Sequence, residues 1–481
     1  MGKGSGPTVA FILDNPQRDL GGLVLTAMQL CEQGVTCHLV PATLRAREIF
    51  ALAPDLVVMF HFRRGFEALV TRLMEARIRV GVLDTEGGVW PDLQIYTELQ
   101  IAERPLRDAV RFFCSWGPRL GDHLVSSGLF QADQVVVTGC PRFDFYHERW
   151  RASVPTPGVA ADGRPRILVN ANYSEANPRF WPVEVVARQL RESWGWTEER
   201  VSLVLDRQRA MLQETLTLVR RLADDVPDAT IVLRPHPFES VDVYRRELGA
   251  LPGVSVEDAG TAQQQIVRAH ATIQRTSTTA MESVLAGVPA LMPAWFPVAA
   301  PMPMVDAVSE PCEQYPVLLD RVREVLAGSY TPDAALTGRI HSVVGDWFST
   351  IDGAAHSRVA DTVLAHLPAH REVDVRACQR VLHGLSDGHP WRSRVPRLVR
   401  RQLALPPEYS FRRLRAEPPK AWLASEQRFT VIDVSAMADQ VSHARRSAGL
   451  ATVSVQAVPT HQRPEFPHRF HAYSVALASA S

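Results

Sequence analysis

The sequence lacks several patterns that mark large classes of proteins. Its six cysteines are scattered along 481 residues without a C-x-x-C pair, so neither a disulfide framework nor a zinc site is expected. No run of about 18 apolar residues occurs, which argues against a membrane-spanning helix. The 52 basic and 52 acidic side chains cancel, so the chain has no general attraction for nucleic acid. These absences predict a cytoplasmic protein with no nucleic-acid partner.

Several short catalytic motifs are missing as well. The sequence has no Walker loop, no G-x-G-x-x-G fingerprint and no G-x-S-x-G elbow, which argues against an NTPase, a dehydrogenase and a hydrolase. No D-x-D pair follows a predicted strand, and His61, His123 and His147 are not spaced as metal ligands. We therefore predict neither a required metal nor a cofactor.

The sequence does contain a regular alternation of strand and helix patterns from residue 8 to about residue 150. Short apolar runs alternate with stretches whose apolar residues recur every three or four positions. This order is typical of a parallel sheet covered by helices on both faces. The predicted strands are 8–13, 35–40, 55–60, 80–83, 110–114 and 135–138.

A second alternating series follows a Pro-, Gly- and Ala-rich stretch at 151–164, which has no periodicity and is predicted to be an interdomain linker. We therefore predict an α/β fold with two Rossmann-like, doubly wound domains, 1–150 and 165–370, that face a cleft. The strands predicted for the second domain are 166–170, 230–233, 254–256, 272–274 and 290–292, and a long helix is predicted at 198–225.

The remaining residues, 371–481, form a C-terminal extension of different character. Its segment 391–420 holds nine Arg or Lys against two Glu, mixed with aromatic and aliphatic residues and broken by prolines. Such a mixture suits peripheral contact with an anionic membrane surface. A basic strap packed on the two domains explains the composition equally well. Weak alternation follows at 429–434 and 451–458.

The candidate binding residues gather at two strand ends of the second domain. One strand ends in Arg234 and His236, and the flanking prolines hold the backbone extended, so both side chains are aimed. The other ends in a run of four hydroxyl residues that includes Ser277, Thr278 and Thr279 and opens a helix. Backbone N–H groups at a helix start and convergent polar donors are what a phosphate needs. The run could instead serve only as a helix cap.

Further polar residues extend this predicted phosphate site. Asn170, Asn172 and Ser174 close the first strand of the second domain, and Glu282 lies near the start of the helix that the hydroxyl run opens. The carboxyl ends of parallel strands face the ligand crevice of an open sheet. We expect these four residues to contact the ligand, although Asn and Ser are also common in plain turns.

Three carboxylates at strand ends of the first domain are candidates for chemistry. Asp84 and Glu86 lie on a Gly-rich turn, and Asp144 follows the last strand of the domain. Two carboxylates that reach one site could act as nucleophile and general base in glycosyl transfer. We expect Asp144 to be the nucleophile or to stabilise the oxocarbenium-like transition state, and Glu86 to be the general base, with Asp84 as the next acid to examine. An acidic turn and a capping Asp144 remain the alternatives.

The ordered motifs VLDTEGG, VTGCPRFDF and ILVNANYSEANP, together with the RPHP element and the Ser/Thr-rich helix start, resemble a known family. Over residues 8–370 the chain is similar to GT-B glycosyltransferases of bacterial surface carbohydrate and capsule biosynthesis, in the group related to β-Kdo transferases. The resemblance implies a CMP-activated donor, with the nucleotide phosphate held by His236 and Ser277 to Thr279. It also implies a donor site in the second domain and an acceptor site in the first.

The function expected from this resemblance is transfer of a sugar, Kdo or another nonulosonic acid, from a CMP-linked donor to a glycan or lipid-linked acceptor. The expected location is the cytoplasm, at the inner face of the membrane if the basic segment attaches there. A CDP-glycerol-type glycerophosphotransferase shares the HP element and is the alternative enzyme. An inactive GT-B scaffold of a polysaccharide-assembly complex is the alternative of another class.

Overall fold

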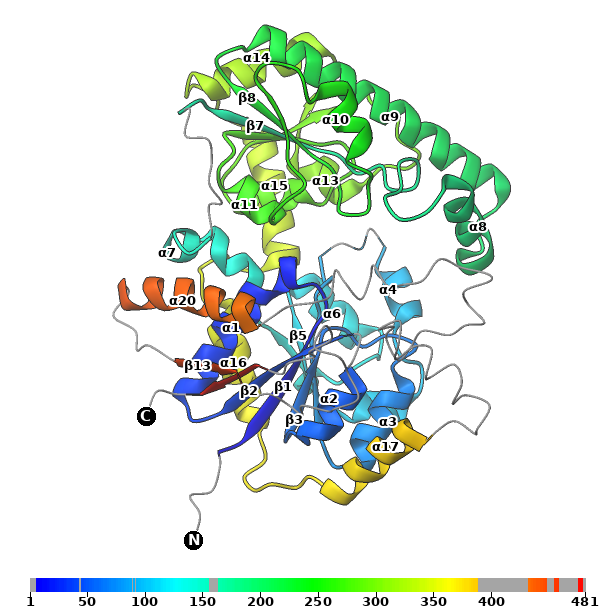
Figure 1. The fold of residues 1–481 in the computed structure, drawn as a ribbon, viewed down its shortest axis with the longest axis vertical. Coiled ribbons are helices and arrows are strands. Elements are labelled where there is room, and N and C mark those ends of the chain that lie inside the picture. The colour runs from blue at the N-terminus through cyan, green and yellow to red at the C-terminus, as the bar shows by residue number, and fades with distance from the viewer. Residues whose placement is uncertain are drawn as a thin grey trace, which may run out of the picture. The chain divides into compact units, whose positions relative to one another are not determined.

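The alternating pattern folds into two units, each built on a parallel sheet with flanking helices (Figure 1). The computed structural model describes residues 6–42, 45–88, 90, 92–154, 163–387, 431–447, 454–457 and 475–478. Unit 1 comprises Met1–Ser153 and Asp346–Ser481, and unit 2 comprises Val154–Gly345. The basic segment 391–420 lies outside the described residues, as does most of the predicted linker, 155–162.

Unit 1 has the sheet order β13-β14-β2-β1-β3-β4-β5-β6, in which β1 to β6 are parallel. The central strands are almost entirely buried because helices cover both faces of the sheet. The chain adds β2 on one side of β1 and then continues with β3 on the other, so the strand order reverses there. The strands are β1 Thr8–Leu13, β2 Thr36–Pro41, β3 Leu56–Met59, β4 Arg79–Leu83, β5 Val110–Ser115 and β6 Val135–Val137.

The helices of unit 1 begin at recognisable signals. The side chain of Asn15 accepts a hydrogen bond from the N–H of Gln17 and caps α1, with Pro16 in its first position. Gly22 lets α1 approach η2, because a Cβ there would lie 2.6 Å from the backbone N of Arg142. The helices are α1 Pro16–Glu32, α2 Arg45–Leu52, α3 Glu67–Glu75, α4 Leu93–Leu99, α5 Arg104–Asp108, α6 Pro118–Ser126, η1 Ala132–Gln134, η2 Pro141–Tyr146, α7 Glu148–Arg151, α16 Ala355–His366, α17 Val375–Asp387 and α20 Val431–Ser447.

The end of the chain returns to unit 1, which corrects one predicted domain boundary. Residues 346–370, predicted for the second domain, belong to unit 1, where α16 packs on α1. The weak alternation at 429–434 overlaps the start of α20, which also packs on α1. The alternation near 451–458 does contain a strand, β13 (Ser454–Ala457). It pairs with β14 (Val475–Ala478), and β14 lies antiparallel to β2 at the edge of the sheet.

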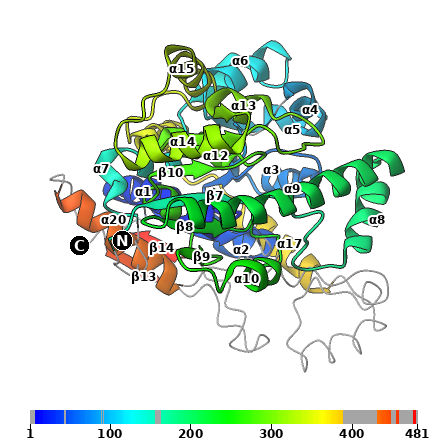
Figure 2. The same ribbon diagram turned by 90° about the horizontal axis from the view of Figure 1, so that it is seen from above.

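Unit 2 has a fully parallel sheet in the order β12-β11-β10-β7-β8-β9. This is the doubly wound Rossmann order, which reverses between β7 and β10. Figure 2 shows the long helix α9 running across the unit, with α8 at its N-terminal end. The strands are β7 Arg166–Asn170, β8 Thr230–Arg234, β9 Val254–Val256, β10 Ala271–Ile273, β11 Ala290–Pro293 and β12 Glu310–Cys312. The helices are α8 Val183–Trp194, α9 Glu198–Asp225, α10 Asp242–Leu248, α11 Ala262–Ile266, α12 Thr279–Leu285, α13 Pro303–Val308, α14 Tyr315–Leu326 and α15 Ala334–Phe348.

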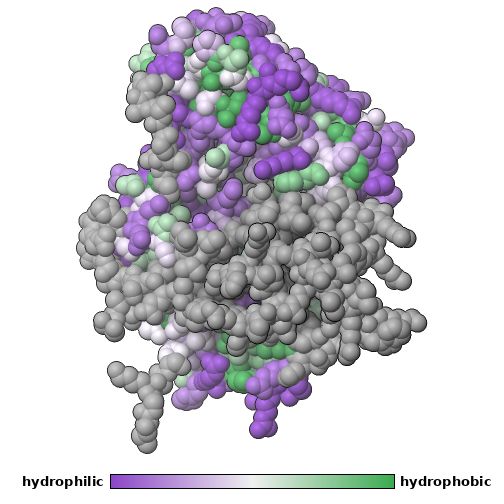
Figure 3. Space-filling view, viewed as in Figure 1, coloured by the Kyte–Doolittle hydropathy of each residue, from purple (hydrophilic) through white to green (hydrophobic). Residues whose placement is uncertain are grey.

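The two doubly wound α/β sheets confirm the predicted fold class of two Rossmann-like domains. Most strand predictions fall within a residue or two of the observed bounds, whereas β12 and β14 were not predicted. The part of unit 2 drawn in Figure 3 carries mainly hydrophilic residues with scattered apolar ones. None of the helices in the described ranges has the length and apolar character needed to cross a membrane.

Candidate functional site

The strand order of unit 2 reverses between β7 and β10, and buried polar side chains follow both strands. Asn170 ends β7 and is 5% exposed, and Gln274 follows β10 and is 2% exposed. Neither the Nδ2 of Asn170 nor either polar side-chain atom of Gln274 has a hydrogen-bond partner in the described part of the chain. Because buried polar atoms are normally paired, these groups are candidates to bind a ligand or water. Asn170 was predicted, and Gln274 was not.

His236 is held as a neutral hydrogen-bond donor next to this edge. Its Nδ1 accepts a hydrogen bond from the N–H of Phe238 at 3.2 Å, which places the ring proton on Nε2. Burial lowers the pKa of His236 to about 4, although the carboxylate of Glu175 acts in the opposite direction. The imidazole is therefore uncharged near neutral pH and can donate one hydrogen bond from Nε2. The sequence predicted the donor but not its neutral state.

The guanidinium of Arg234 forms its hydrogen bonds within unit 2. Its guanidinium is 6% exposed and donates to the carbonyl of Ala259 at 3.0 Å and to that of Gly260 at 2.8 Å. Burial lowers its pKa, with the nearby Asp258, Glu257 and Glu282 opposing that effect. The geometry therefore favours a positioning role for Arg234, which holds the loop after β9, over the direct ligand contact that the sequence predicted.

Part of the hydroxyl run after β10 caps a helix, which was the alternative to phosphate binding. The Oγ of Ser277 accepts hydrogen bonds from the N–H and the hydroxyl of Thr279, at 3.3 and 2.8 Å. Thr278 precedes α12 and makes no capping bond with its side chain. Glu282 lies in the first turn of this helix. Capping therefore occupies Ser277 and Thr279 at least in part.

The loop after β7 is tied to its neighbours on both sides. Asn172 donates from Nδ2 to the carbonyl of Thr276 at 3.0 Å, which joins this loop to the hydroxyl run. Ser174 donates to the carboxylate of Glu175 at 3.2 Å. The predicted residues Asn170, Asn172 and Ser174 thus lie on one ordered loop at the reversal of the strand order.

Glu239 joins the loops after β7 and β8 and was not singled out from the sequence. It is 2% exposed, and its Oε1 accepts hydrogen bonds from the N–H of Tyr173 at 2.7 Å and of His236 at 3.3 Å. The hydroxyl of Tyr244 donates to its Oε2. Burial raises the pKa of Glu239 to about 7. Because its partners come from three segments, no local sequence pattern could have revealed this role.

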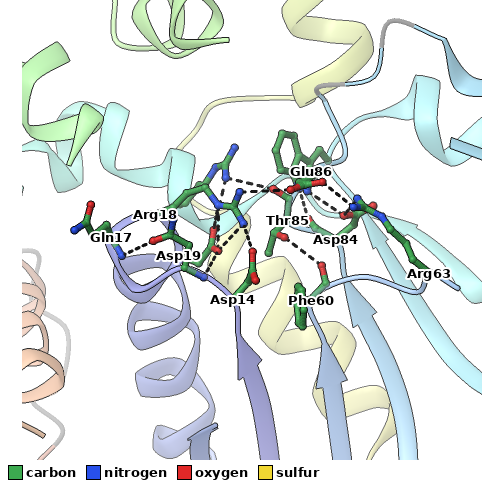
Figure 4. A network of polar contacts seen from close by, with 12 residues as sticks. Asp14, Gln17, Arg18, Asp19, Phe60, Arg63, Asp84, Thr85 and Glu86 are labelled. Carbon is green, nitrogen blue, oxygen red and sulfur yellow. Dashed lines mark hydrogen bonds and ion pairs between the residues drawn. The ribbon is translucent and has the colours of Figure 1, made fainter. Parts of the chain in front are cut away.

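Unit 1 presents a different edge, a network of ion pairs at the ends of β1, β3 and β4 (Figure 4). Arg18 lies at its centre and donates to Asp14 at 3.1 Å and to Asp19 at 2.9 Å, with Glu86 at 3.8 Å. Burial acts to lower the pKa of Arg18, but the surrounding carboxylates outweigh it and raise the pKa. Burial raises the pKa of Asp14, against the attraction of Arg18.

Glu86 is the more accessible carboxylate of the predicted pair. Its side chain is 34% exposed and forms a 2.7 Å ion pair with Arg63. Burial acts to raise its pKa, but Arg63 and Arg18 outweigh that effect and hold the pKa below its usual range. Asp84 is fully buried, accepts hydrogen bonds from the N–H of Glu86 at 2.9 Å and from the hydroxyl of Tyr96, and has a pKa raised by burial. Asp84 therefore positions the turn that carries Glu86.

Asp144 is committed to a structural contact within unit 1. It is 3% exposed, and its two carboxylate oxygens accept hydrogen bonds from the N–H groups of Ala355 and His356 at 3.0 and 2.8 Å. The Nδ1 of His356 lies 2.8 Å from the same carboxylate. Asp144 thus caps α16, which is the alternative that the sequence left open. This geometry argues against a catalytic role for Asp144.

The arginines and acids around Glu86 were missed from the sequence. Arg142 lies 3.6 Å from Asp19, donates to the carbonyl of Thr85 at 3.3 Å and stacks its guanidinium 4.6 Å from the ring centroid of Trp116. A signal in the sequence was that Asp14 directly follows β1 and that Arg142 lies in the segment after β6, at strand ends that face the ligand crevice.

No protein-family model matches the sequence, and no curated protein matches it. Among solved structures, the S. aureus MnaA–UDP structure is 13% identical, with a TM-score of 0.46 over 77% of this chain and 100% of that one. A UDP-GlcNAc 2-epimerase from Neisseria meningitidis bound to UDP-GlcNAc is 12% identical, with a TM-score of 0.45 over 75% and 100%. The wall teichoic acid polymerase TagF is 11% identical, with a TM-score of 0.38 over 65% and 73%. The fold assignment rests on the strand orders of the chain itself.

Proposed function

We propose that this protein is a glycosyltransferase that moves a sugar from a nucleotide-activated donor to a glycan or lipid-linked acceptor in surface polysaccharide synthesis. The observation that carries the proposal is the edge of unit 2 where the strand order reverses. There the neutral donor His236 lies at the same sheet edge as the buried Asn170 and Gln274, and the Nδ2 of Asn170 and both side-chain polar atoms of Gln274 have no partner among the described residues. Nucleotides bind at this place in doubly wound sheets.

The donor nucleotide binds unit 2 in this proposal. The Nε2–H of His236 donates to a phosphate oxygen, and Thr278 and the N–H groups beside it supply further donors. Asn170 and Gln274 meet the ligand with amide groups, and Glu282 accepts from ligand hydroxyls. The CMP-linked donor, with Kdo or another nonulosonic acid, rests on the resemblance of the motifs around these residues.

The acceptor binds unit 1, where Glu86 is the proposed general base toward the acceptor hydroxyl. Arg63 and Arg18 keep Glu86 ionised and fix its orientation. Asp84 accepts a hydrogen bond from the N–H of Glu86 and so holds the turn in place. A carboxylate with a lowered pKa is a weak base, so proton transfer must accompany departure of the leaving phosphate. Because α16 occupies Asp144, Asp144 is given no step in this mechanism.

The occupied carboxylate of Asp144 also favours a second candidate, a CDP-alcohol phosphotransferase. Phosphoryl transfer requires positioning and charge stabilisation more than a carboxylate nucleophile, and His236 could donate to the reacting phosphate. The third alternative, an inactive scaffold, fits less well. A scaffold has no need for a 34% exposed Glu86 held by arginines, or for buried amides at the nucleotide edge that lack partners among the described residues.

Attachment to the membrane through 391–420 is a separate proposal, supported by the basic and aromatic composition of that segment. Co-sedimentation with vesicles of increasing anionic lipid content tests it. Binding that rises with anionic lipid supports peripheral attachment, and binding independent of lipid charge supports a packed strap.

The function itself is tested by a thermal-shift screen of CMP-, CDP-, UDP- and GDP-linked donors, followed by product analysis. A stabilising CMP-sugar and a new glycosidic bond are expected. A new phosphodiester would decide for the phosphotransferase. If no nucleotide stabilises the protein at millimolar concentration, the proposed donor site is wrong.

A further inference from the structure

A glutamate outside the motifs described above is held in a fixed position by a glutamine on α9. The Oε1 of Gln208 accepts hydrogen bonds from the backbone N–H groups of Glu175 and Ala176, both at 3.1 Å. The Nε2 of the same amide donates to the Oε2 of Glu175. Ser174 donates to this oxygen as well, at 3.2 Å. The backbone and one carboxylate oxygen of Glu175 are therefore fixed together.

The other carboxylate oxygen of Glu175 is available. Its Oε1 accepts no hydrogen bond from any described residue, whereas Oε2 accepts two. Glu175 is partly buried, and its Oε1 is not among the buried polar atoms that lack a partner in the described residues, so this oxygen stays open to water or to a ligand. The pattern indicates an acceptor that is held ready for a group outside the chain.

Glu175 and His236 are neighbours because a single atom joins their loops. The Oε1 of Glu239 accepts from the N–H of Tyr173 at 2.7 Å and from the N–H of His236 at 3.3 Å. The Glu175 carboxylate also acts electrostatically on His236. A fixed carboxylate acceptor and a fixed imidazole donor thus lie on two joined loops at the edge of unit 2, close enough to interact electrostatically.

The open oxygen of Glu175 has the hydrogen-bonding character of a hydroxyl site. An alcohol can donate to the Oε1 of Glu175, whereas a phosphate can only accept and is repelled by the carboxylate, so the single Nε2–H of His236 is left for the phosphate. The geometry points to Glu175 as a substrate-contacting residue that binds a hydroxyl of the sugar or polyol attached to the phosphate held at His236. This inference rests on the proposed nucleotide site and specifies which part of the ligand lies beside it.

An aromatic surface next to the pair suits such a ligand. Phe238 is 39% exposed, and its ring centroid lies 5.3 Å from that of His236 and 6.3 Å from that of Phe180. The N–H of Arg179 donates to the carbonyl of Phe238 at 2.8 Å, which fixes the two loops together. An apolar ring face beside a carboxylate matches the alternating CH and OH groups of a sugar or polyol.

The test compares the full-length wild type with Glu175→Gln by calorimetry. Glu175→Gln keeps the size of the side chain and can still accept from Gln208, but it removes the charge. Five probes are titrated: pyrophosphate, CMP, CDP-glycerol, UDP and UDP-GlcNAc. Glu198→Gln on the exposed start of α9 is the matched control, since it makes the same substitution away from the site. Loss of a charged hydrogen bond to a hydroxyl should weaken binding roughly ten- to hundredfold.

The set of probes that lose affinity shows which hydroxyl group Glu175 binds. Weaker binding of CDP-glycerol or UDP-GlcNAc with unchanged CMP and UDP places the hydroxyl on the transferred group. Weaker binding of CMP or UDP as well places it on the ribose. In both cases pyrophosphate should bind as tightly as before or more tightly. The inference is overturned if all ligands that bind the wild type stay within twofold, or if pyrophosphate weakens in parallel with the nucleotides. If the wild type binds no nucleotide, the proposed function is wrong, and this inference, which rests on it, is wrong as well.

Discussion

The sheet edges of the two units use polar residues in opposite ways. In unit 1 the carboxylates of Asp14, Asp19 and Glu86 are neutralised by arginines of the same unit. In unit 2 the edge holds a neutral imidazole, buried amides without partners among the described residues, and the carboxylate of Glu175 with one oxygen unused. In the proposed function the charge-balanced edge orients the acceptor and transfers a proton, and the edge with unpaired groups binds the donor.

The largest effect is expected from removing the accessible carboxylate of unit 1. Glu86→Gln keeps the shape of the side chain but removes the base, so turnover should fall by about a hundredfold or more with nucleotide affinity unchanged. Turnover and nucleotide binding are measured in parallel, with the exposed Glu75→Gln on α3 as control. Turnover above a tenth of wild type would remove Glu86 from the chemistry.

The next effect separates catalysis from structure at Asp144. Asp144→Ala removes the cap of α16 and leaves the buried His356 without its partner, so unfolding should require about 2 to 4 kcal/mol less free energy. Urea denaturation measures this loss, and turnover per folded molecule should change less than threefold. A variant of normal stability with no turnover would restore the catalytic role that the sequence suggested.

A pH effect is expected from Glu239 in unit 2. Because burial raises its pKa to about 7 from 4.5, the folded state keeps a proton that the unfolded chain releases. Stability from this group is therefore present below pH 4.5 and is lost as pH rises toward 7, by up to about 3 kcal/mol. Glu239→Gln should flatten the dependence of the urea midpoint between pH 5 and pH 8. An unchanged slope would show that Glu239 ionises normally in the folded protein.

The smallest effect is a shift in the pH profile of turnover. Arg63 holds the pKa of Glu86 below its usual range, so Arg63→Gln should raise that pKa. The acidic limb of the pH–rate profile should then move upward by about one pH unit, because the base becomes protonated at higher pH. Arg72→Gln on the exposed face of α3 provides the matched control. A limb that stays in place would mean that another group titrates there.

The sequence predicted elements whose signals are local. Strands of buried apolar residues, the proline-flanked His236 and the polar residues after β7 could be located because each depends on neighbours in the chain. Residues whose partners lie far away could not be interpreted. The carboxylate of Asp144 meets α16 more than 200 residues later, and Arg18 meets Glu86 from another strand end. The neutral state of His236 also depends on burial, which a sequence pattern does not report.

The central claim is that the nucleotide phosphate binds unit 2 at His236. Calorimetric titration of CMP into the wild type and His236→Ala tests it most directly. Loss of the hydrogen bond from Nε2 to a charged acceptor should cost about 1.5 to 3 kcal/mol, or roughly ten- to hundredfold in affinity. An affinity for His236→Ala within twofold of wild type would contradict the account.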